Sequence, residues 1–146
     1  MILIRKYTEE DLESVTELMA DLGSPSGIEE MKERIRLIEL QSNYFTFVAT
    51  INEKVVGMIG VRQNYTYTSN KVKTQISALV TKKEYQGQGI GKALISFIQD
   101  WTRSNGSDFL YLTSGIKEER RNAHEFYKKS GFEITGYRFV KRIKQL

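Results

Sequence analysis

The chain of 146 residues, with 40% hydrophobic and 27% charged side chains, has the size and composition of a single globular domain. The absence of cysteine and the single histidine, His124, exclude disulfides, a cysteine nucleophile, and thiolate or multi-histidine metal sites. A formal net charge of +4 suits an anionic ligand but is too small to indicate nucleic acid. Without an apolar run of about 18 residues or a secretory signal, we expect a cytoplasmic protein that does not bind membranes.

The first third of the chain predicts a strand followed by two amphipathic helices. The apolar run Ile2-Leu3-Ile4 favours a strand, and Thr8 with Asp11 three residues later is typical of a capped helix start. Apolar residues at helical spacing then mark a first helix at Leu12, Val15, Leu18, Met19 and Leu22, and a second at Ile28, Met31, Ile35 and Ile38. The sequence Gly23-Ser24-Pro25-Ser26-Gly27 separates the two helices, because glycine and proline interrupt helical structure.

Strands without intervening helices are expected next. Residues 45–50 are rich in β-branched and aromatic side chains, and Asn52-Glu53 is typical of a hairpin turn into a second strand over 54–61. A polar stretch that contains Tyr65 and Tyr67 leads to a further strand over about 73–80.

The remaining elements alternate between helix and strand. After a cluster of glycines, apolar residues at helical spacing indicate a helix that ends near Asn105-Gly106: Ile90, Leu94, Phe97, Ile98 and Trp101. We expect a short strand over 109–112, a short helix around 123–127 stopped by Gly131, and a strand or bent pair of strands over 132–143. This order predicts one α/β (α+β) domain over residues 1–146, with helices on the faces of a mixed sheet.

The glycine-rich loop before the third helix is the sharpest feature of the sequence. It reads Gln86-Gly87-Gln88-Gly89-Ile90-Gly91-Lys92 and lies between a predicted strand and a predicted helix. A helix N-terminus offers unpaired N–H groups and the positive end of the helix dipole, and glycines allow close approach of a phosphate. The loop therefore predicts a site for a diphosphate; the alternative is a helix that simply begins after a flexible turn.

Two common phosphate motifs do not fit this loop. A Walker A motif needs glycine at position 86 and serine or threonine at position 93, which are Gln86 and Ala93. In a dinucleotide fingerprint the third glycine comes one residue later than Gly91, and it needs an alternating βαβ context that the N-terminal half lacks. A loop that binds the diphosphate of coenzyme A fits the spacing.

The same residues resemble the Gln/Arg-x-x-Gly-x-Gly/Ala signature of the GNAT superfamily of N-acetyltransferases. The later segment Asn122–Phe132 resembles the superfamily's Ala-x-x-Phe-Tyr-x-Lys-x-Gly-Phe block, and the two blocks lie in the expected order. The ending of the chain also resembles the branch that acetylates aminoalkylphosphonates and other small amines. The resemblance implies a three-layer GNAT-like domain with a mostly antiparallel central sheet.

The resemblance implies acetyl-CoA as co-substrate and a small-molecule amine as acceptor, with no metal, no nucleic acid partner and a homodimer as an option. The implied cofactor-binding residues are Leu79, Val80, Gln86, Gly87, Gln88, Gly89, Ile90, Gly91, Lys92, Asn122 and Lys129. A backbone N–H near Val80 would polarise the thioester carbonyl, and Asn122 would bind the pantetheine arm or only cap its helix. Lys129 is a candidate for the adenosine-side phosphates, as are Lys82 and Lys83, for which a solvated role is the stronger alternative.

Tyr127 is the implied catalytic residue, as the general acid that protonates the departing thiolate; the alternative is a purely packing role. His124 is the only imidazole, but its position two residues after Asn122 favours a surface or packing role over that of a base. Several relatives carry glutamate on the central strand, whereas residues 75–80 here contain no carboxylate. The sequence therefore leaves the general base unassigned.

The acceptor wall is expected from residues 23–30 and 64–70, where Tyr65 and Tyr67 would line a pocket and Glu29 or Glu30 would attract a cation; solvated loop residues are the alternative. Acetylation of a protein or peptide, and a non-catalytic acyl-CoA-binding module, remain alternative functions.

Overall fold

The computed structural model describes residues 1–145 and divides the chain into two compact units, Met1–Leu112 and Thr113–Leu146. Within the described residues, no helix combines the length and the apolar character needed to cross a bilayer.

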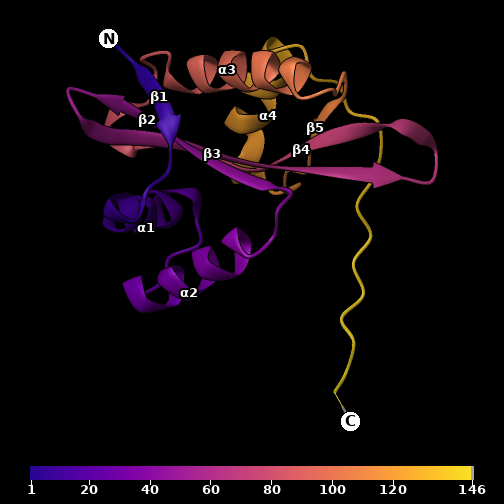
Figure 1. Ribbon diagram of the computed structural model, residues 1–146, viewed down its shortest axis with the longest axis horizontal. Coiled ribbons are helices and arrows are strands. Elements are labelled where there is room, and N and C mark those ends of the chain that lie inside the picture. The colour runs from indigo at the N-terminus through magenta and orange to yellow at the C-terminus, as the bar shows by residue number, and fades with distance from the viewer. Residues whose placement is uncertain (146) are drawn as a thin grey trace. The chain divides into compact units, whose positions relative to one another are not determined.

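The first unit is built on a five-stranded sheet (Figure 1). Its strands are β1 (Leu3–Lys6), β2 (Tyr44–Ile51), β3 (Lys54–Thr66), β4 (Ser69–Thr81) and β5 (Leu110–Leu112). They lie side by side in chain order. The first four pair antiparallel, and β5 pairs parallel to β4. The sheet is therefore mixed and mostly antiparallel, as the family resemblance implied.

Helices cover both faces of this sheet (Figure 1). The helices α1 (Leu12–Leu22) and α2 (Ile28–Glu39) lie on one face, and α3 (Ile90–Ser104) lies on the other. Short 3₁₀ turns precede α1 at Glu9–Asp11 and follow β4 at Lys83–Tyr85. The predicted three-layer α/β arrangement is confirmed within this unit.

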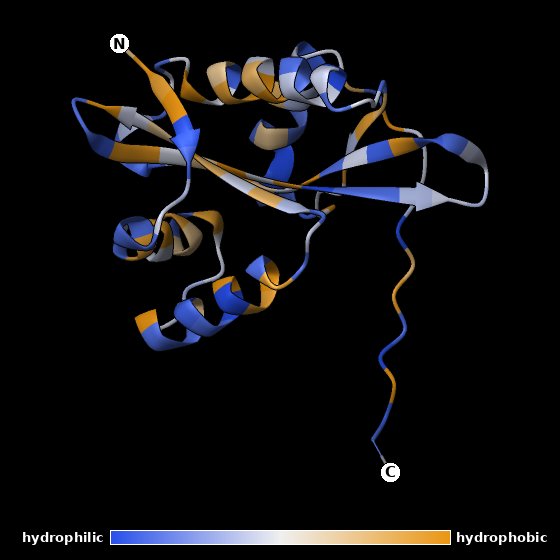
Figure 2. Cartoon of the chain, viewed as in Figure 1, coloured by the Kyte–Doolittle hydropathy of each residue, from blue (hydrophilic) through white to orange (hydrophobic). Residues whose placement is uncertain are grey.

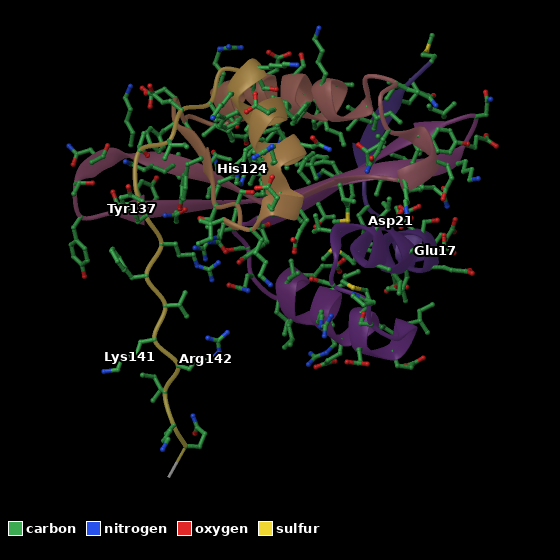
Figure 3. All side chains as sticks on the ribbon, turned by 180° about the vertical axis from the view of Figure 1, so that it is seen from behind. Glu17, Asp21, His124, Tyr137, Lys141 and Arg142 are labelled. Atoms are coloured by element: carbon green, nitrogen blue, oxygen red, sulfur yellow. The ribbon has the colours of Figure 1, made fainter. Side chains whose placement is uncertain are left out.

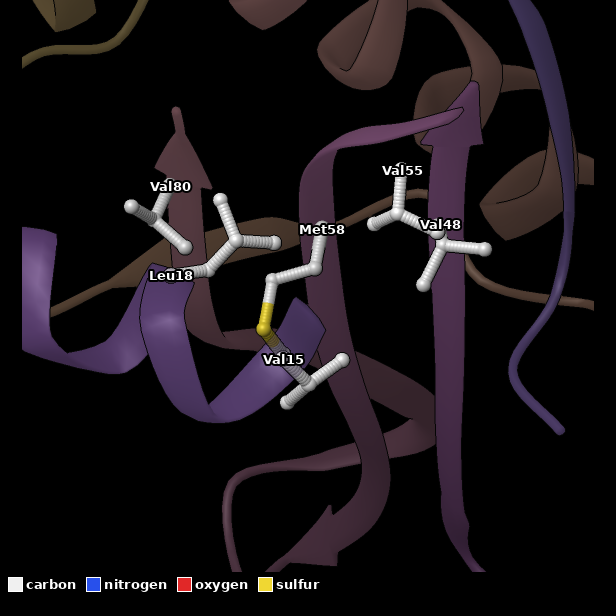
Figure 4. Close-up of a cluster of buried hydrophobic side chains, with 6 residues drawn as sticks. All are labelled: Val15, Leu18, Val48, Val55, Met58 and Val80. Atoms are coloured by element: carbon white, nitrogen blue, oxygen red, sulfur yellow. The ribbon is translucent and has the colours of Figure 1, made fainter. Parts of the chain in front are cut away.

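A cluster of buried apolar side chains joins α1 to the sheet (Figure 4). It consists of Val15, Leu18, Val48, Val55, Met58 and Val80. On the opposite face, α3 packs through aromatic rings: Phe97 lies 4.9 Å from Phe47, and Trp101 lies 4.9 Å from Phe45, between ring centroids. Figure 2 shows where this core ends along the strands. They are hydrophobic where they cross the helices and hydrophilic at the far end of the β3–β4 hairpin.

Two turns of the first unit match the sequence in detail. Asn52 and Glu53 have φ values of 49° and 67°, the left-handed conformation that a tight hairpin turn needs. The amide of Thr8 donates to the Asp11 carboxylate at 2.9 Å, which confirms the predicted helix start. The polar stretch that includes Tyr65 is not a loop, since β3 continues to Thr66 and forms one long hairpin with β4.

The second unit contains the 3₁₀ turn Glu118–Arg120 and α4 (Arg121–Lys129). The predicted strand or strand pair over 132–143 is wrong, because no residue of 130–145 belongs to a helix or a strand. A strand needs a hydrogen-bonded neighbour, and this segment has none among the described residues. Its apolar side chains are exposed instead, among them Ile134 (78%) and Phe139 (92%). Figure 3 shows Tyr137, Lys141 and Arg142 along this segment.

Candidate functional site

The glycine-rich loop adopts a conformation that requires glycine at two positions. Gly87 and Gly89 have φ values of 81° and 85°, and Gly89 is the N-terminal cap residue of α3. A side chain in this left-handed region is strained, whatever space is available. A Cβ atom at either position would meet nothing within 4 Å, so the backbone here faces open space.

The amides of this loop form a row of unused hydrogen-bond donors. No side chain caps α3, and within residues 1–145 the N–H groups of 87–92 donate no hydrogen bond. The first intrahelical bond of α3 is the one from Ala93 to the carbonyl of Gly89, at 3.0 Å. Free amides at the positive end of a 15-residue helix bind anions such as phosphate.

The strand that leads into this loop has an open edge. Strand β5 pairs with β4 only at residues 74–76, so residues 77–81 have β3 on one side and no strand on the other within the described chain. The pairing of β3 and β4 shifts at Gly60 and Val61, which leaves Ser77 without a partner residue, as in a β-bulge. An extended chain that carries amide groups can pair with such an edge.

Two contacts from α1 hold the start of the loop. The Lys82 ammonium forms an ion pair with Glu17 at 3.3 Å, and the amide of Lys83 donates to the Asp21 carboxylate at 3.1 Å. Figure 3 shows Glu17 and Asp21 together on α1. The contact with Glu17 favours the structural alternative for Lys82, because its charge is already neutralised by a carboxylate.

Tyr127 lies in α4 of the second unit, between two aromatic rings. The ring centroids of Phe126 and Phe132 are 5.7 and 6.0 Å from the Tyr127 ring. Burial raises the pKa of the Tyr127 phenol, while the nearby Arg120 opposes this with a smaller effect. The phenol oxygen has no hydrogen-bond partner among the described residues, and its raised pKa keeps the group protonated at neutral pH.

His124 is engaged in a structural contact, which favours the packing alternative over a base. Its Nε2 lies 2.7 Å from the carbonyl oxygen of Gly115 and 3.1 Å from the Ser114 hydroxyl. Since a carbonyl only accepts, Nε2 carries the proton and ties α4 to the preceding segment. Asn122 and Lys129, at the two ends of the same helix, are exposed and make no side-chain hydrogen bond within the described residues.

The two tyrosines expected in the acceptor wall are exposed in the described chain. Tyr65 and Tyr67 are 75% and 110% exposed, because they lie at the far end of the β3–β4 hairpin. Glu29 and Glu30 are exposed in the first turn of α2. A cleft of about 170 Å³ lies instead beside β1 and β2, where Lys6, Tyr7, Ile38, Glu39, Tyr44, Phe45, Thr46 and Phe47 line it. That cleft is at the opposite edge of the sheet from β5.

One polar contact on the sheet has no signal in the sequence. The Nε of Arg62 on β3 donates to the Oε1 of Gln75 on β4 at 2.7 Å. The two residues are 13 positions apart and meet only through the register of the hairpin. No motif marks such a pair, and only the strand alternation could have placed it on one face.

The comparisons with known proteins agree with this geometry. Residues 12–132 match the profile of the acetyltransferase (GNAT) family. The chain is 28% identical over 141 residues to an aminoalkylphosphonate N-acetyltransferase of Salmonella typhimurium, covering 96% of this chain and 90% of that protein. It is 28% identical over 133 residues to N-alpha-acetyltransferase 30 of Schizosaccharomyces pombe, covering 90% and 84%.

Among solved structures, a GNAT family acetyltransferase from Staphylococcus aureus has the same fold. It aligns with a TM-score of 0.83 at 23% identity, covering 97% of this chain and 98% of that one. The matched residues include both the glycine-rich loop and α4. The chain therefore belongs to the GNAT acetyltransferase family and is an acetyl-CoA-dependent acyltransferase.

Proposed function

We propose that this protein transfers the acetyl group of acetyl-CoA to the primary amine of a small molecule, with Tyr127 as general acid. The observation that supports it is the sequence of unused backbone donors in the first unit. They are the amides of 87–92 together with those backbone groups of 77–81 that face away from β3. They suit a ligand with an extended amide-bearing arm and a diphosphate, which is the chemistry of coenzyme A.

Two segments of the first unit hold the coenzyme in this proposal. The amides of Gly87 to Lys92, with the side chains of Gln86 and Gln88 beside them, bind the diphosphate. Leu79, whose backbone groups face the open edge of β4, pairs with a pantetheine amide, Val80 lies beside it, and an amide near Val80 polarises the thioester carbonyl. Asn122 and Lys129 supply further hydrogen bonds and positive charge from the second unit.

The chemical step needs a neutral amine, a donor to the oxyanion and a proton for the sulfur. The amine nitrogen attacks the thioester carbon, the C–S bond breaks, and the phenol of Tyr127 gives its proton to the departing thiolate. The nitrogen loses its extra proton to solvent, from which the Tyr127 phenolate is protonated again. The raised pKa of Tyr127 keeps this proton in place at neutral pH. No carboxylate lies on residues 75–80, so Ser77 and a bound water, or the neutral fraction of the amine, serve in place of a glutamate base.

A screen for thiol release tests the proposal. Acetyl-CoA is mixed with the protein and a library of amines, and free thiol is followed over time. Because the chain contains no cysteine, all thiol comes from the coenzyme. We expect release that depends on a primary amine of low molecular mass, and mass spectrometry of the product should show one added acetyl group.

The peptide alternative rests on the similarity to N-alpha-acetyltransferase 30. Peptides with free N-termini therefore belong in the same screen. Faster release with peptides than with any small amine would replace the proposed acceptor class. Calorimetric binding of acetyl-CoA without release for any amine or peptide would indicate the non-catalytic module instead.

A further inference from the structure

A row of four side chains crosses the sheet on one face. It takes one residue from each of four neighbouring strands: Tyr44, Arg62, Gln75 and Tyr111. Residues paired across strands point to the same face. Arg62 also shares its face with Met58, four positions earlier on β3, which packs against α1. The row is thus on the α1 side of the sheet, with Tyr44 beside the end of α2.

The guanidinium of Arg62 is held in place by neutral groups only. Its Nε donates to Gln75, and its Cζ lies 6.0 Å from the centroid of the Tyr44 ring. Among residues 1–145, Arg62 forms no ion pair, and its two terminal amino groups donate no hydrogen bond. The side chain is half-buried, so these donors are oriented and partly desolvated without a counter-charge.

Lys73 adds positive charge to the face of the sheet that carries Arg62. Lys73 lies two positions before Gln75 on β4 and therefore on the same face, with its ammonium 4.2 Å from the Phe109 ring centroid. Of the acidic groups on this side, Asp108 is paired with Lys71 at 2.9 Å, and Glu39, which lines a cleft with Tyr44, forms no ion pair with Arg62 in the described chain. An oriented arginine fork without a carboxylate partner is suited to a bidentate oxyanion.

The row also lies close to the position of the chemistry. Ser77, the bulged residue of β4, has its hydroxyl 3.1 Å from the position of a Cβ on Gly60, so it projects onto the face that Gly60 shares with Arg62. Ala78 lies on the edge of β4 assigned to the pantetheine arm. At the ordinary rise of a strand, the Cα atom of Gln75 is about 10 Å from the Cα atom of Ala78. A single small molecule can span that distance.

We propose that Arg62 binds an oxyanion on the acceptor, so that the substrate is a primary amine that also carries a carboxylate or a phosphonate. This inference rests on the proposed function, because it takes the acyl group to lie at the open edge of β4. Gln75 and Tyr44 are positioning residues that hold the guanidinium. The anion determines which amines are acetylated, and the amine end reaches the thioester.

Matched pairs of amines test this inference. We would measure kcat/KM for 2-aminoethylphosphonate against ethylamine, and for 6-aminohexanoate against hexylamine, in the wild type and in Arg62→Gln. The anionic member of at least one pair should be preferred by the wild type. In the variant that preference should fall by about 10- to 100-fold, which is the usual effect of losing a charge-assisted hydrogen bond, with neutral amines unaffected.

Two further variants separate binding from folding. Arg62→Lys keeps the charge but not the fork and should retain an intermediate preference. Arg103→Gln removes the same charge from an exposed pair on α3 and should change nothing. If Arg62→Gln loses the preference for 2-aminoethylphosphonate over ethylamine, the anion is a phosphonate. If it loses the preference for 6-aminohexanoate over hexylamine, the anion is a carboxylate. Neutral amines that react as well as anionic ones, or an unchanged preference in Arg62→Gln, would overturn the inference.

Calorimetry distinguishes failure of this inference from failure of the proposed function. If no amine releases thiol, the proposed function fails, and binding of 2-aminoethylphosphonate and 6-aminohexanoate to the CoA-loaded protein still reports on Arg62. We expect binding that weakens in Arg62→Gln while the affinity for CoA stays the same. Equal affinities in the two proteins, or no binding of either anion to the wild type, would contradict the role of Arg62.

Discussion

At the scale of single residues, the environment of a side chain decides its chemistry. Tyr127 lies between two aromatic rings, and burial raises the pKa of its phenol, so the phenol stays protonated at neutral pH. His124 illustrates the opposite case. It is the only imidazole in the chain, yet its Nε2 is occupied by the Gly115 carbonyl at 2.7 Å.

Replacing Tyr127 by phenylalanine removes only the phenol oxygen. We expect kcat to fall by about 10²-fold, because a general acid contributes at least that much, while the calorimetric affinity for acetyl-CoA changes little. Tyr137→Phe, at an 89% exposed position, is the matched control and should leave kcat unchanged. Unchanged turnover of Tyr127→Phe would remove this residue from the mechanism.

Asp11 is the residue for which stability depends most clearly on pH. Its buried carboxylate receives two hydrogen bonds from Arg5, at 2.7 and 2.8 Å, which lower its pKa below the ordinary value. A lowered folded-state pKa stabilises the protein above the ordinary carboxyl pKa, and this contribution is lost as pH falls through the lowered value.

We expect Asp11→Asn to reduce the free energy of unfolding at pH 7 by about 1–2 kcal/mol, a modest value because Arg5 is nearly half exposed. Urea denaturation at pH 7 and at pH 3 would check this. The difference between wild type and variant should narrow at the lower pH. Asp108→Asn, which breaks an exposed pair, should have no measurable effect. A constant difference at both pH values would contradict the account of Asp11.

At the scale of elements, backbone conformation places the functional groups. The left-handed glycines before α3 turn a row of amides outward, and the short pairing of β5 leaves the edge of β4 open beside them. Neither feature depends on a particular side chain. For this reason substitutions that alter the backbone test the site more directly than substitutions of charges.

Gly89→Ala strains the turn that presents these amides, where φ is 85°. We expect affinity for acetyl-CoA to fall by about 10-fold, in line with strain of roughly 1–2 kcal/mol for an L-residue in this region. Gly106→Ala, where φ is 80° at the other end of α3, carries the same backbone strain. Titration calorimetry should show normal affinity in that variant, and equal losses in both would show that the loop has no special role.

The β2–β3 hairpin offers a stabilising change. Glu53 has a φ of 67°, which is unfavourable for a residue with a Cβ atom. Glu53→Gly should raise the free energy of unfolding by about 0.5–1 kcal/mol, because glycine adopts this conformation without steric cost. Thermal and urea unfolding would measure the gain, and Asn52→Gly should gain less since asparagine tolerates the left-handed region. A destabilised Glu53→Gly protein would show that the turn is not a source of strain.

At the scale of the whole molecule, periodicity predicted most elements and chain order predicted the layers. Alternation and helical spacing depend on burial, so α1, α2, α3 and the central strands were visible in the sequence. The features that the sequence did not predict depend on contacts between residues far apart in the chain. Residues 132–143 have the alternating composition of a strand, but pairing needs a partner that composition does not specify. The open edge of β4 and the contact from Arg62 to Gln75 depend on register, which a single sequence does not show.

The central claim is that the unused amides of the first unit bind the diphosphate and pantetheine arm of acetyl-CoA. The most direct measurement is ¹⁵N-labelled nuclear magnetic resonance of the wild-type protein during titration with CoA, with the amides of residues 79–80 and 87–92 assigned. Those resonances should shift together and saturate at one affinity, while the amides of Gly23 and Gly106 stay in place. A titration that leaves the loop amides unmoved, or that shifts them only for ligands without a diphosphate, would contradict it.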